Sequence, residues 1–139
     1  MRTIKIVSNA NINPILTLDK PLEYAHYSED IEIDLETTVK IKSEVAILSR
    51  NIKIQGDSLT SQQSLNGGIF MVHSTGGLES IARLDSVEFN HAGQAFKEYR
   101  YPIHFHMISN AEKSYIKNCV INQSFSRAIG LSGVKNLLV

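Results

Sequence analysis

The chain has 139 residues, in which 14 Lys and Arg balance 14 Asp and Glu, 42% of the residues are hydrophobic, and Cys119 is the one cysteine. The balanced charge excludes a nucleic-acid partner held by a basic surface, and the hydrophobic content is that of a folded rather than a disordered protein. A single cysteine excludes an internal disulfide and a cysteine-based zinc site.

The N-terminal apolar run, Ile4 to Val7, is interrupted by Lys5 and is too short for a signal peptide. No stretch reaches the ~20 apolar residues of a membrane span. The C-terminal residues Asn136-Leu-Leu-Val139 resemble the start of an apolar strand with no polar tail after it. We therefore expect a fragment of a longer protein, which would meet a membrane only through parts outside this chain.

Apolar residues alternate with polar ones along the chain, which is the pattern of half-buried strands. The clearest run is Asp30-Ile-Glu-Ile-Asp-Leu-Glu36, where we expect Ile31, Ile33 and Leu35 to point inward. The same spacing predicts further strands at 4–6, 16–18, 39–41, 45–47, 52–54, 87–89 and 119–121. Short strands with few helix signals indicate an all-β protein.

A Ser-, Gln- and Gly-rich stretch at about 56–77 interrupts this pattern, and we expect it to form a surface loop. Near its end, the apolar cluster Ile69-Phe-Met-Val72 predicts a strand that returns to the core.

Three phrases at nearly equal spacing align without gaps: Arg50-Asn-Ile-Lys-Ile-Gln55, Asp85-Ser-Val-Glu-Phe-Asn90 and Lys117-Asn-Cys-Val-Ile-Asn122. Their third and fifth residues are apolar and their sixth is an amide. A fourth phrase is expected to begin at Lys135. Such repeats predict stacked turns of chain, with apolar residues filling a core and amides bonding at the corners.

The predicted fold is thus a right-handed parallel β-helix, a pectin-lyase-like solenoid, spanning residues 1–139 as one region. An antiparallel sandwich with coincidental spacing is the alternative. Cys119 falls at an inward-facing position of the repeat and is expected to be buried and inert rather than nucleophilic.

Three of the five histidines, His91, His104 and His106, fall between residues 89 and 107. In a strand, Ile103, Phe105 and Met107 would share the core face, so His104 and His106 would project outward. Two imidazoles at this spacing can share a divalent metal ion, completed by His91 or Glu98. The alternatives are hydrogen bonds within the fold or binding of a polar ligand. His26 and His73 are isolated and are expected to be structural or surface residues.

Arg100 lies between Tyr99 and Tyr101, a grouping suited to sugar stacking and carboxylate binding or, alternatively, to a packed, salt-bridged corner. The ligand-binding candidates are therefore His91, Arg100, His104 and His106, and the metal candidates are His104 and His106. Asp85, Glu88 and Glu98 are the nearest carboxylates for glycoside hydrolysis, although no catalytic residue can be assigned. Asn122-Gln-Ser124 is the one N-glycosylation sequon.

Several segments resemble the β-helix region of the fibrocystin and fibrocystin-like proteins, which the cell-migration-inducing hyaluronidase and its transmembrane relative share. They are His91-Ala-Gly-Gln-Ala-Phe96, Arg100-Tyr-Pro-Ile-His-Phe-His106, Ser114-Tyr-Ile-Lys-Asn-Cys119 and Ser126-Arg-Ala128, with weaker matches at 18–26 and 44–51. The resemblance extends from about Leu16 to Val139.

This resemblance implies a large extracellular or cell-surface protein built around a parallel β-helix. One branch of the family degrades hyaluronan in a calcium-linked manner, and the fibrocystin branch is receptor-like. The phrase Gly93-Gln-Ala-Phe96 is similar to the fibrocystin branch. We expect a segment that binds glycans or extracellular proteins, and the alternative is part of a hyaluronan-degrading enzyme.

Overall fold

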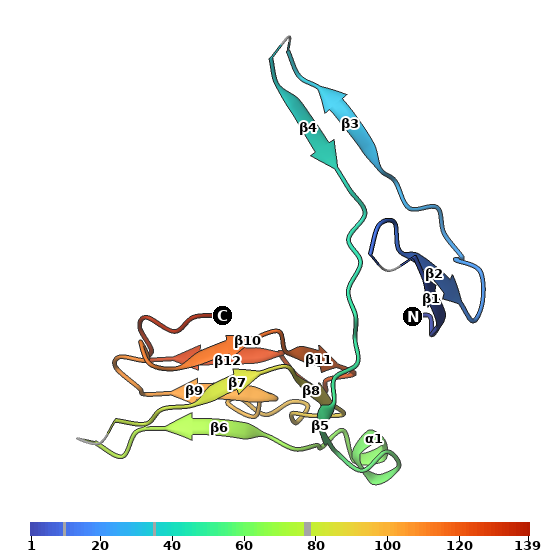
Figure 1. The fold of residues 1–139 in the computed structure, drawn as a ribbon. Helices are drawn as coiled ribbons and strands as arrows, with labels where there is room; N and C mark the ends of the chain where they lie inside the picture. The colour runs from blue at the N-terminus through green and yellow to red at the C-terminus, as the bar shows by residue number, and fades with distance from the viewer. Residues whose placement is uncertain (10, 35, 77–78) are drawn as a thin grey trace. The chain divides into compact units, whose positions relative to one another are not determined.

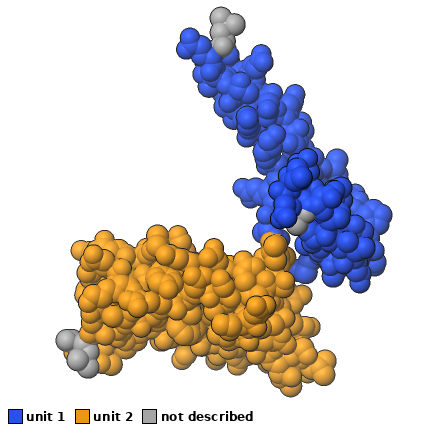
Figure 2. Space-filling view, in the orientation of Figure 1, with its two compact units in different colours: residues 1–46 blue, residues 47–139 orange. Residues whose placement is uncertain are grey.

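The computed structural model in Figure 1 describes every residue except 10, 35, 77 and 78. The chain divides into two compact units, Met1–Ala46 and Ile47–Val139, which Figure 2 shows in different colours. From the sequence, one region spanning residues 1–139 is predicted. The alternation behind this prediction indicates strands but does not say which strands pair.

The first unit consists of antiparallel hairpins. Strand β1 (Ile4–Ser8) pairs with β2 (Ile15–Leu18), and β3 (Glu29–Glu32) pairs with β4 (Thr38–Ile41). The expectation that Ile31 and Ile33 point inward is wrong, because their side chains are 39% and 65% exposed, while Leu35 lies outside the described residues. A two-stranded hairpin has no second layer to cover either face, so alternation alone cannot bury these residues.

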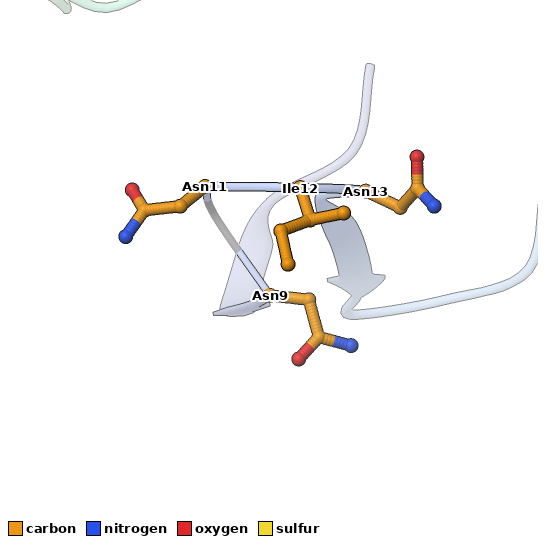
Figure 3. Close-up of a pocket in the computed structure, with 4 residues that line it drawn as sticks. All are labelled: Asn9, Asn11, Ile12 and Asn13. Atoms are coloured by element: carbon orange, nitrogen blue, oxygen red, sulfur yellow. The ribbon is translucent and has the colours of Figure 1, made fainter.

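A hollow of about 460 Å³ lies at the turn between β1 and β2. Asn9, Asn11, Ile12 and Asn13 line it, and Figure 3 shows that the amides point away from one another. Because these polar groups do not converge on one point, the hollow has no shape for a specific ligand.

In the described part of the second unit the strands form three parallel sheets, shown in Figure 1. One joins β5 (Ile52–Gln55), β8 (Val87–Asn90) and β11 (Val120–Asn122); the next joins β6 (Phe70–His73), β9 (Ile103–His106) and β12 (Ile129–Ser132); the last joins β7 (Arg83–Asp85) and β10 (Tyr115–Lys117). Successive strands thus enter different sheets and return to stack on an earlier turn of chain. We call each turn a rung: β5–β6, β7–β9 and β10–β12.

Residues at matching positions of the three aligned phrases are register partners in the β5–β8–β11 sheet. Ile52 pairs with Val87 and Ile54 with Phe89 across β5 and β8, as the alignment of the first two phrases places them. Asn122 pairs with Asn90 across β11 and β8, as the alignment of the last two places them. The aligned phrases therefore correspond to strands that lie side by side, and the all-β content and parallel pairing expected from them are confirmed.

Two predicted strand positions are wrong. Residues 45–47 form no strand. The fourth phrase does not continue the β11 sheet, because Leu138 bridges Tyr115 and so stacks on β10 instead. The fourth phrase has the same residue types as the other three but pairs with a different strand. A change in the length of a corner shifts which residues pair without changing the local sequence pattern.

The core of the second unit lies between the sheets. Phe89, Ile103 and Phe105 are almost completely buried, and half-buried Cys119 packs against this cluster. Met107 does not join them as predicted: it follows β9 at φ 54° and is 58% exposed. Corner residues at matching places adopt the same left-handed conformation: Ser86 and Asn118, and His91 and Gln123. At one corner the Asn118 amide donates to Asp85 of the neighbouring rung at 3.1 Å.

The Ser-, Gln- and Gly-rich stretch contains a short helix, α1 (Thr60–Ser64), followed by β6, the strand predicted at its end. The Asp57 carboxylate accepts hydrogen bonds from the backbone N–H groups of Leu59 and Thr60, which fixes the start of this helix. Among the described residues, no helix is long and apolar enough to cross a membrane.

Candidate functional site

Aromatic and imidazole rings gather on the outer face of the β6–β9–β12 sheet. Strand β9 places Ile103 and Phe105 in the core, and His104 and His106 therefore lie on the opposite face. In the sheet His106 pairs with His73 of β6 and with Ser132 of β12. We call the following residues the ring cluster: His73, Tyr99, Tyr101, His104 and His106.

His104 is the buried centre of this cluster, with no exposed surface. Its Nδ1 lies 3.0 Å from the backbone oxygen of Tyr99, and its Nε2 lies 3.4 Å from the hydroxyl of Ser132. Burial lowers the pKa of His104, because a charged imidazole would lose its hydration there. Burial thus favours the uncharged imidazole, and His104 supports the rings around it.

Tyr99 and Tyr101 cover His104. The Tyr99 ring stacks on His104 with centroids 5.7 Å apart and planes 13° apart, and Tyr101 meets His104 edge-on at 5.3 Å. Tyr101 can lie this close to the sheet because residue 130 is glycine: a Cβ there would fall 1.9 Å from the Tyr101 Cδ2. The sequence analysis assigned these tyrosines to Arg100, whereas the structure packs them on histidine.

His73 and His106 form the exposed side of the cluster. Their rings stack at 5.3 Å with planes 28° apart, and the Nδ1 of His73 lies 3.2 Å from the backbone oxygen of His106. His106 also contacts His104 at 5.2 Å and Tyr99 at 5.7 Å between centroids. His73, considered isolated in the sequence, is therefore next to two of the candidate residues.

Arg100 lies in the loop that carries both tyrosines. Its backbone oxygen accepts hydrogen bonds from the N–H of Gln94 at 2.8 Å and the hydroxyl of Ser126 at 2.9 Å. Its side chain is exposed and makes no ion pair with the described residues. The backbone is fixed while the guanidinium remains open to a ligand, unlike the salt-bridged corner considered from sequence.

His91 lies outside the ring cluster. It follows β8 at φ 47°, its ring stacks on Phe125 at 6.0 Å, and its Nε2 lies 2.9 Å from the Gln62 amide nitrogen. Its Nδ1 is buried without a partner among the described residues. Two glycines fit closely around its backbone oxygen, since a Cβ at Gly56 or Gly67 would fall 2.4 or 1.8 Å from that atom. His91 thus has structural contacts at a rung corner.

Of the carboxylates considered for catalysis, Asp85 and Glu88 belong to the neighbouring strands β7 and β8, and Glu98 directly precedes Tyr99 of the ring cluster. Glu88 is buried and pairs with Lys53 at 3.1 Å; burial raises its pKa, but hydrogen bonds from Lys53, Arg50 and Asn90 lower it more, so the net shift is downward. Hydrogen bonds from Ser86 and Asn118 lower the pKa of Asp85. Glu98 is exposed in the loop with Arg100. In the described part of the chain, no three or more His, Cys, Asp or Glu residues group in a way that could hold a metal ion.

The sequon residue Asn122 is half-buried at the end of β11, in register with Asn90. The hydroxyl of Ser124 donates to the Ser126 backbone oxygen at 2.6 Å. Glycosylation of Asn122 stays a prediction.

Sequence reasoning missed His73, although a signal for it was present. Phe70-Met-Val-His73 and Ile103-His-Phe-His106 share an apolar-x-apolar-His pattern and are register partners in the sheet. Their separation along the chain is close to that of the aligned phrases. The same search, extended to the second strand of each rung, would therefore have paired His73 with His106.

Comparison with known proteins identifies related chains. The sequence model of the CEMIP beta-helix family matches residues 65–139. Mouse fibrocystin-L is 33% identical over 172 aligned positions, which cover 99% of this chain and 4% of the relative; the human protein gives 32% with the same coverage. The cell surface hyaluronidase of Danio rerio is 29% identical over 94% of this chain and 10% of its own length. The chain spans a small part of these curated relatives. No solved structure matches it significantly.

Proposed function

Since the chain belongs to the CEMIP beta-helix family, we propose that it is a right-handed parallel β-helix segment of a cell-surface protein and that it binds an extended glycan. The binding surface is the outer face of the β6–β9–β12 sheet together with the 91–102 loop. The proposed extracellular location is supported by the similarity to a cell surface hyaluronidase.

The observation that carries this proposal is the position of Tyr99. One face of its ring stacks on the buried His104, and its side chain remains 49% exposed. A ring held rigidly from behind loses little entropy when a sugar packs on its open face. Phe96, completely exposed in the same loop, is a second aromatic side chain open to a ligand. More than one aromatic contact along a loop suits an extended polymer.

Cationic side chains accompany the platform. Lys97, Arg100 and Arg127 are exposed on two loops, 91–102 and 123–128, which are joined by the hydrogen bond from the Phe125 N–H to the Ala92 oxygen at 3.0 Å. Glu98 is the carboxylate among them. This local excess of positive charge suits a glycan that carries carboxylates, such as hyaluronan, although the chain as a whole has no net charge.

A hyaluronan-degrading enzyme is the second candidate, favoured by the relative named cell surface hyaluronidase. Glycoside hydrolysis uses one carboxylic acid of raised pKa and a second carboxylate across the scissile bond. The pKa values of Asp85 and Glu88 are lowered instead, and Glu88 already pairs with Lys53. These residues are poorly suited to donate a proton, so we place binding before cleavage.

The test uses the full chain and hyaluronan of defined length. Retention is measured by surface plasmon resonance on immobilised polymer, and chain length by size-exclusion chromatography after incubation. We expect retention without shortening, and we expect Tyr99→Ala to weaken binding about fivefold to tenfold through loss of the stacking face.

Tyr24→Ala is the matched control, because Tyr24 is 78% exposed in the first unit and belongs to no ring cluster. Equal weakening in both variants, or no retention of the polymer, contradicts the proposal. Shortening of the polymer that persists in a tag-free, repurified sample supports the enzyme instead. If the chain binds an extracellular protein and none of the glycans tested, its ligand is a protein and the glycan proposal is wrong.

A further inference from the structure

We propose that His73 and His106 bind a divalent transition-metal ion, of the zinc, copper or nickel type, on the outer face of the β6–β9–β12 sheet. The site uses one histidine from each of two neighbouring strands. It does not depend on glycan binding, although an ion held there would lie beside Tyr99, which contacts His106 at 5.7 Å between ring centroids.

The separation of the two rings is that of a chelating pair. His73 and His106 are register partners in parallel strands, and their ring centroids are 5.3 Å apart. Two imidazoles bound to one tetrahedral ion through bonds of about 2 Å have centroids roughly 5 Å apart. To face one ion, the two stacked rings have to turn about their side-chain bonds, and the exposed position of His73 leaves its ring room to do so.

The hydrogen bonds leave a nitrogen free on each ring. His73 Nδ1 donates to the backbone oxygen of His106, which places its proton on Nδ1 and leaves the lone pair of Nε2 for a metal. The His106 ring has no hydrogen-bond partner among the described residues, and its Nδ1 is buried. The Nε2 of His106 is therefore the nitrogen that an ion can reach.

Both ring nitrogens of His104, the other metal candidate expected from sequence, already have partners within the fold. Its two nitrogens face the Tyr99 oxygen and the Ser132 hydroxyl, and it has no exposed surface. Binding a metal there would require breaking one of these contacts and opening the tyrosine cover. The structure thus shifts the proposed pair from positions i and i+2 of one strand to register partners on two strands.

The donor set selects the metal. Imidazole nitrogen suits zinc, copper and nickel, whereas calcium and magnesium require oxygen ligands. With two protein donors, the remaining coordination positions stay open to water or to an oxygen of a bound ligand. The site would therefore be weaker than a structural zinc site and would exchange its metal readily.

The experiment titrates the tag-free chain with zinc chloride, and separately with calcium chloride, by isothermal titration calorimetry without glycan. We expect one zinc ion per chain and no calcium. Replacing His73 by Ala should weaken zinc binding about tenfold or more, because the site loses half of its protein donors. His26→Ala is the matched control, since His26 is an exposed histidine of the first unit. Thermal melting without metal verifies that both variants fold.

Nitrogen-15 NMR of the histidine rings identifies the ligands directly. The proposal predicts that zinc shifts Nε2 of His73 and His106 and leaves the nitrogens of His104 unchanged. It is overturned if zinc does not bind, if His73→Ala and His26→Ala behave alike, or if the shifts appear at His104. Because no glycan is present, failure of the glycan proposal leaves this result unaffected.

Discussion

Residues 1–46 and residues 47–139 both alternate apolar with polar side chains, but only the second group builds a core. In the first, Ile6 is 59% and Ile33 is 65% exposed. In the second, Phe89 and Phe105 are 1% and 0% exposed. The local pattern is the same, so the difference comes from how the strands meet. Antiparallel hairpins leave both faces uncovered, whereas stacked rungs close three sheets around one interior.

The same lesson applies within the second unit. Ile52 and Ile54 occupy the same inward register as Val87 and Phe89, yet they are 59% and 38% exposed because they belong to the first rung. Val72 of the same first rung is only 9% exposed. The place of an apolar residue within its rung therefore matters to its burial as well as the neighbouring rungs.

The largest expected effect is a core truncation compared with its counterpart in a hairpin. Phe105→Ala should lower the free energy of unfolding by about 3–5 kcal/mol, because it leaves a cavity among packed side chains. Ile33→Ala should change it by less than about 0.5 kcal/mol. Urea denaturation of both variants measures this difference, and equal losses would mean that the hairpins also bury their apolar face.

The next effect concerns the cover of the ring cluster. Gly130→Ala places a Cβ 1.9 Å from the Tyr101 ring and should cost about 1–3 kcal/mol as that ring is displaced. Gly68→Ala is the control, because nothing lies within 4 Å of its Cβ and it should cost less than about 0.5 kcal/mol. Denaturation midpoints compare the two, and an unchanged midpoint for Gly130→Ala would show that Tyr101 does not pack on the sheet.

A smaller effect separates the ion pairs of the two units. Lys53→Met leaves Glu88 buried without its partner and should cost about 1 kcal/mol, a value reduced by the partial exposure of Lys53. Lys42→Met removes an exposed pair with Asp30, 3.3 Å apart, and should cost less than about 0.5 kcal/mol. A larger decrease in Tm for Lys42→Met than for Lys53→Met would contradict this comparison.

The smallest effect is a pH dependence that arises at His104 of the second unit. Burial lowers the pKa of His104 below its ordinary value of 6.5, so the unfolded chain takes up a proton more readily than the folded one. The stability from neutral His104 is complete above pH 6.5 and declines as the pH falls below that value. Tm should decrease modestly between about pH 7.5 and about pH 5.5.

His104→Asn, which keeps an amide for the nearby hydrogen bonds, should flatten this slope, and His26→Asn should not. A slope that is the same in both variants would assign the pH dependence to groups other than His104.

The alternation and repeats of the sequence were enough to predict an all-β protein and the register of the β5–β8–β11 sheet. Paired strands of this sheet bring residues of the same type next to one another, so the repeat in the sequence matches the pairing. The alternation and repeats also predicted that His104 and His106 lie opposite Ile103 and Phe105, since successive residues of a strand point to opposite faces. They did not predict the antiparallel pairing of residues 1–46, because the same alternation of apolar and polar residues occurs in parallel and in antiparallel strands.

Only the tertiary structure decided what surrounds each outward side chain. The sequence determined that His104 leaves the core, but the loop carrying Tyr99 and Tyr101 folds back over Gly130 and buries it. The sequence likewise contained His73, but its proximity to His106 depends on a pairing between strands of different rungs. Local pattern sets the direction of a side chain, whereas its environment is made by chain that is distant in sequence, which is why the ring cluster emerged only from the fold.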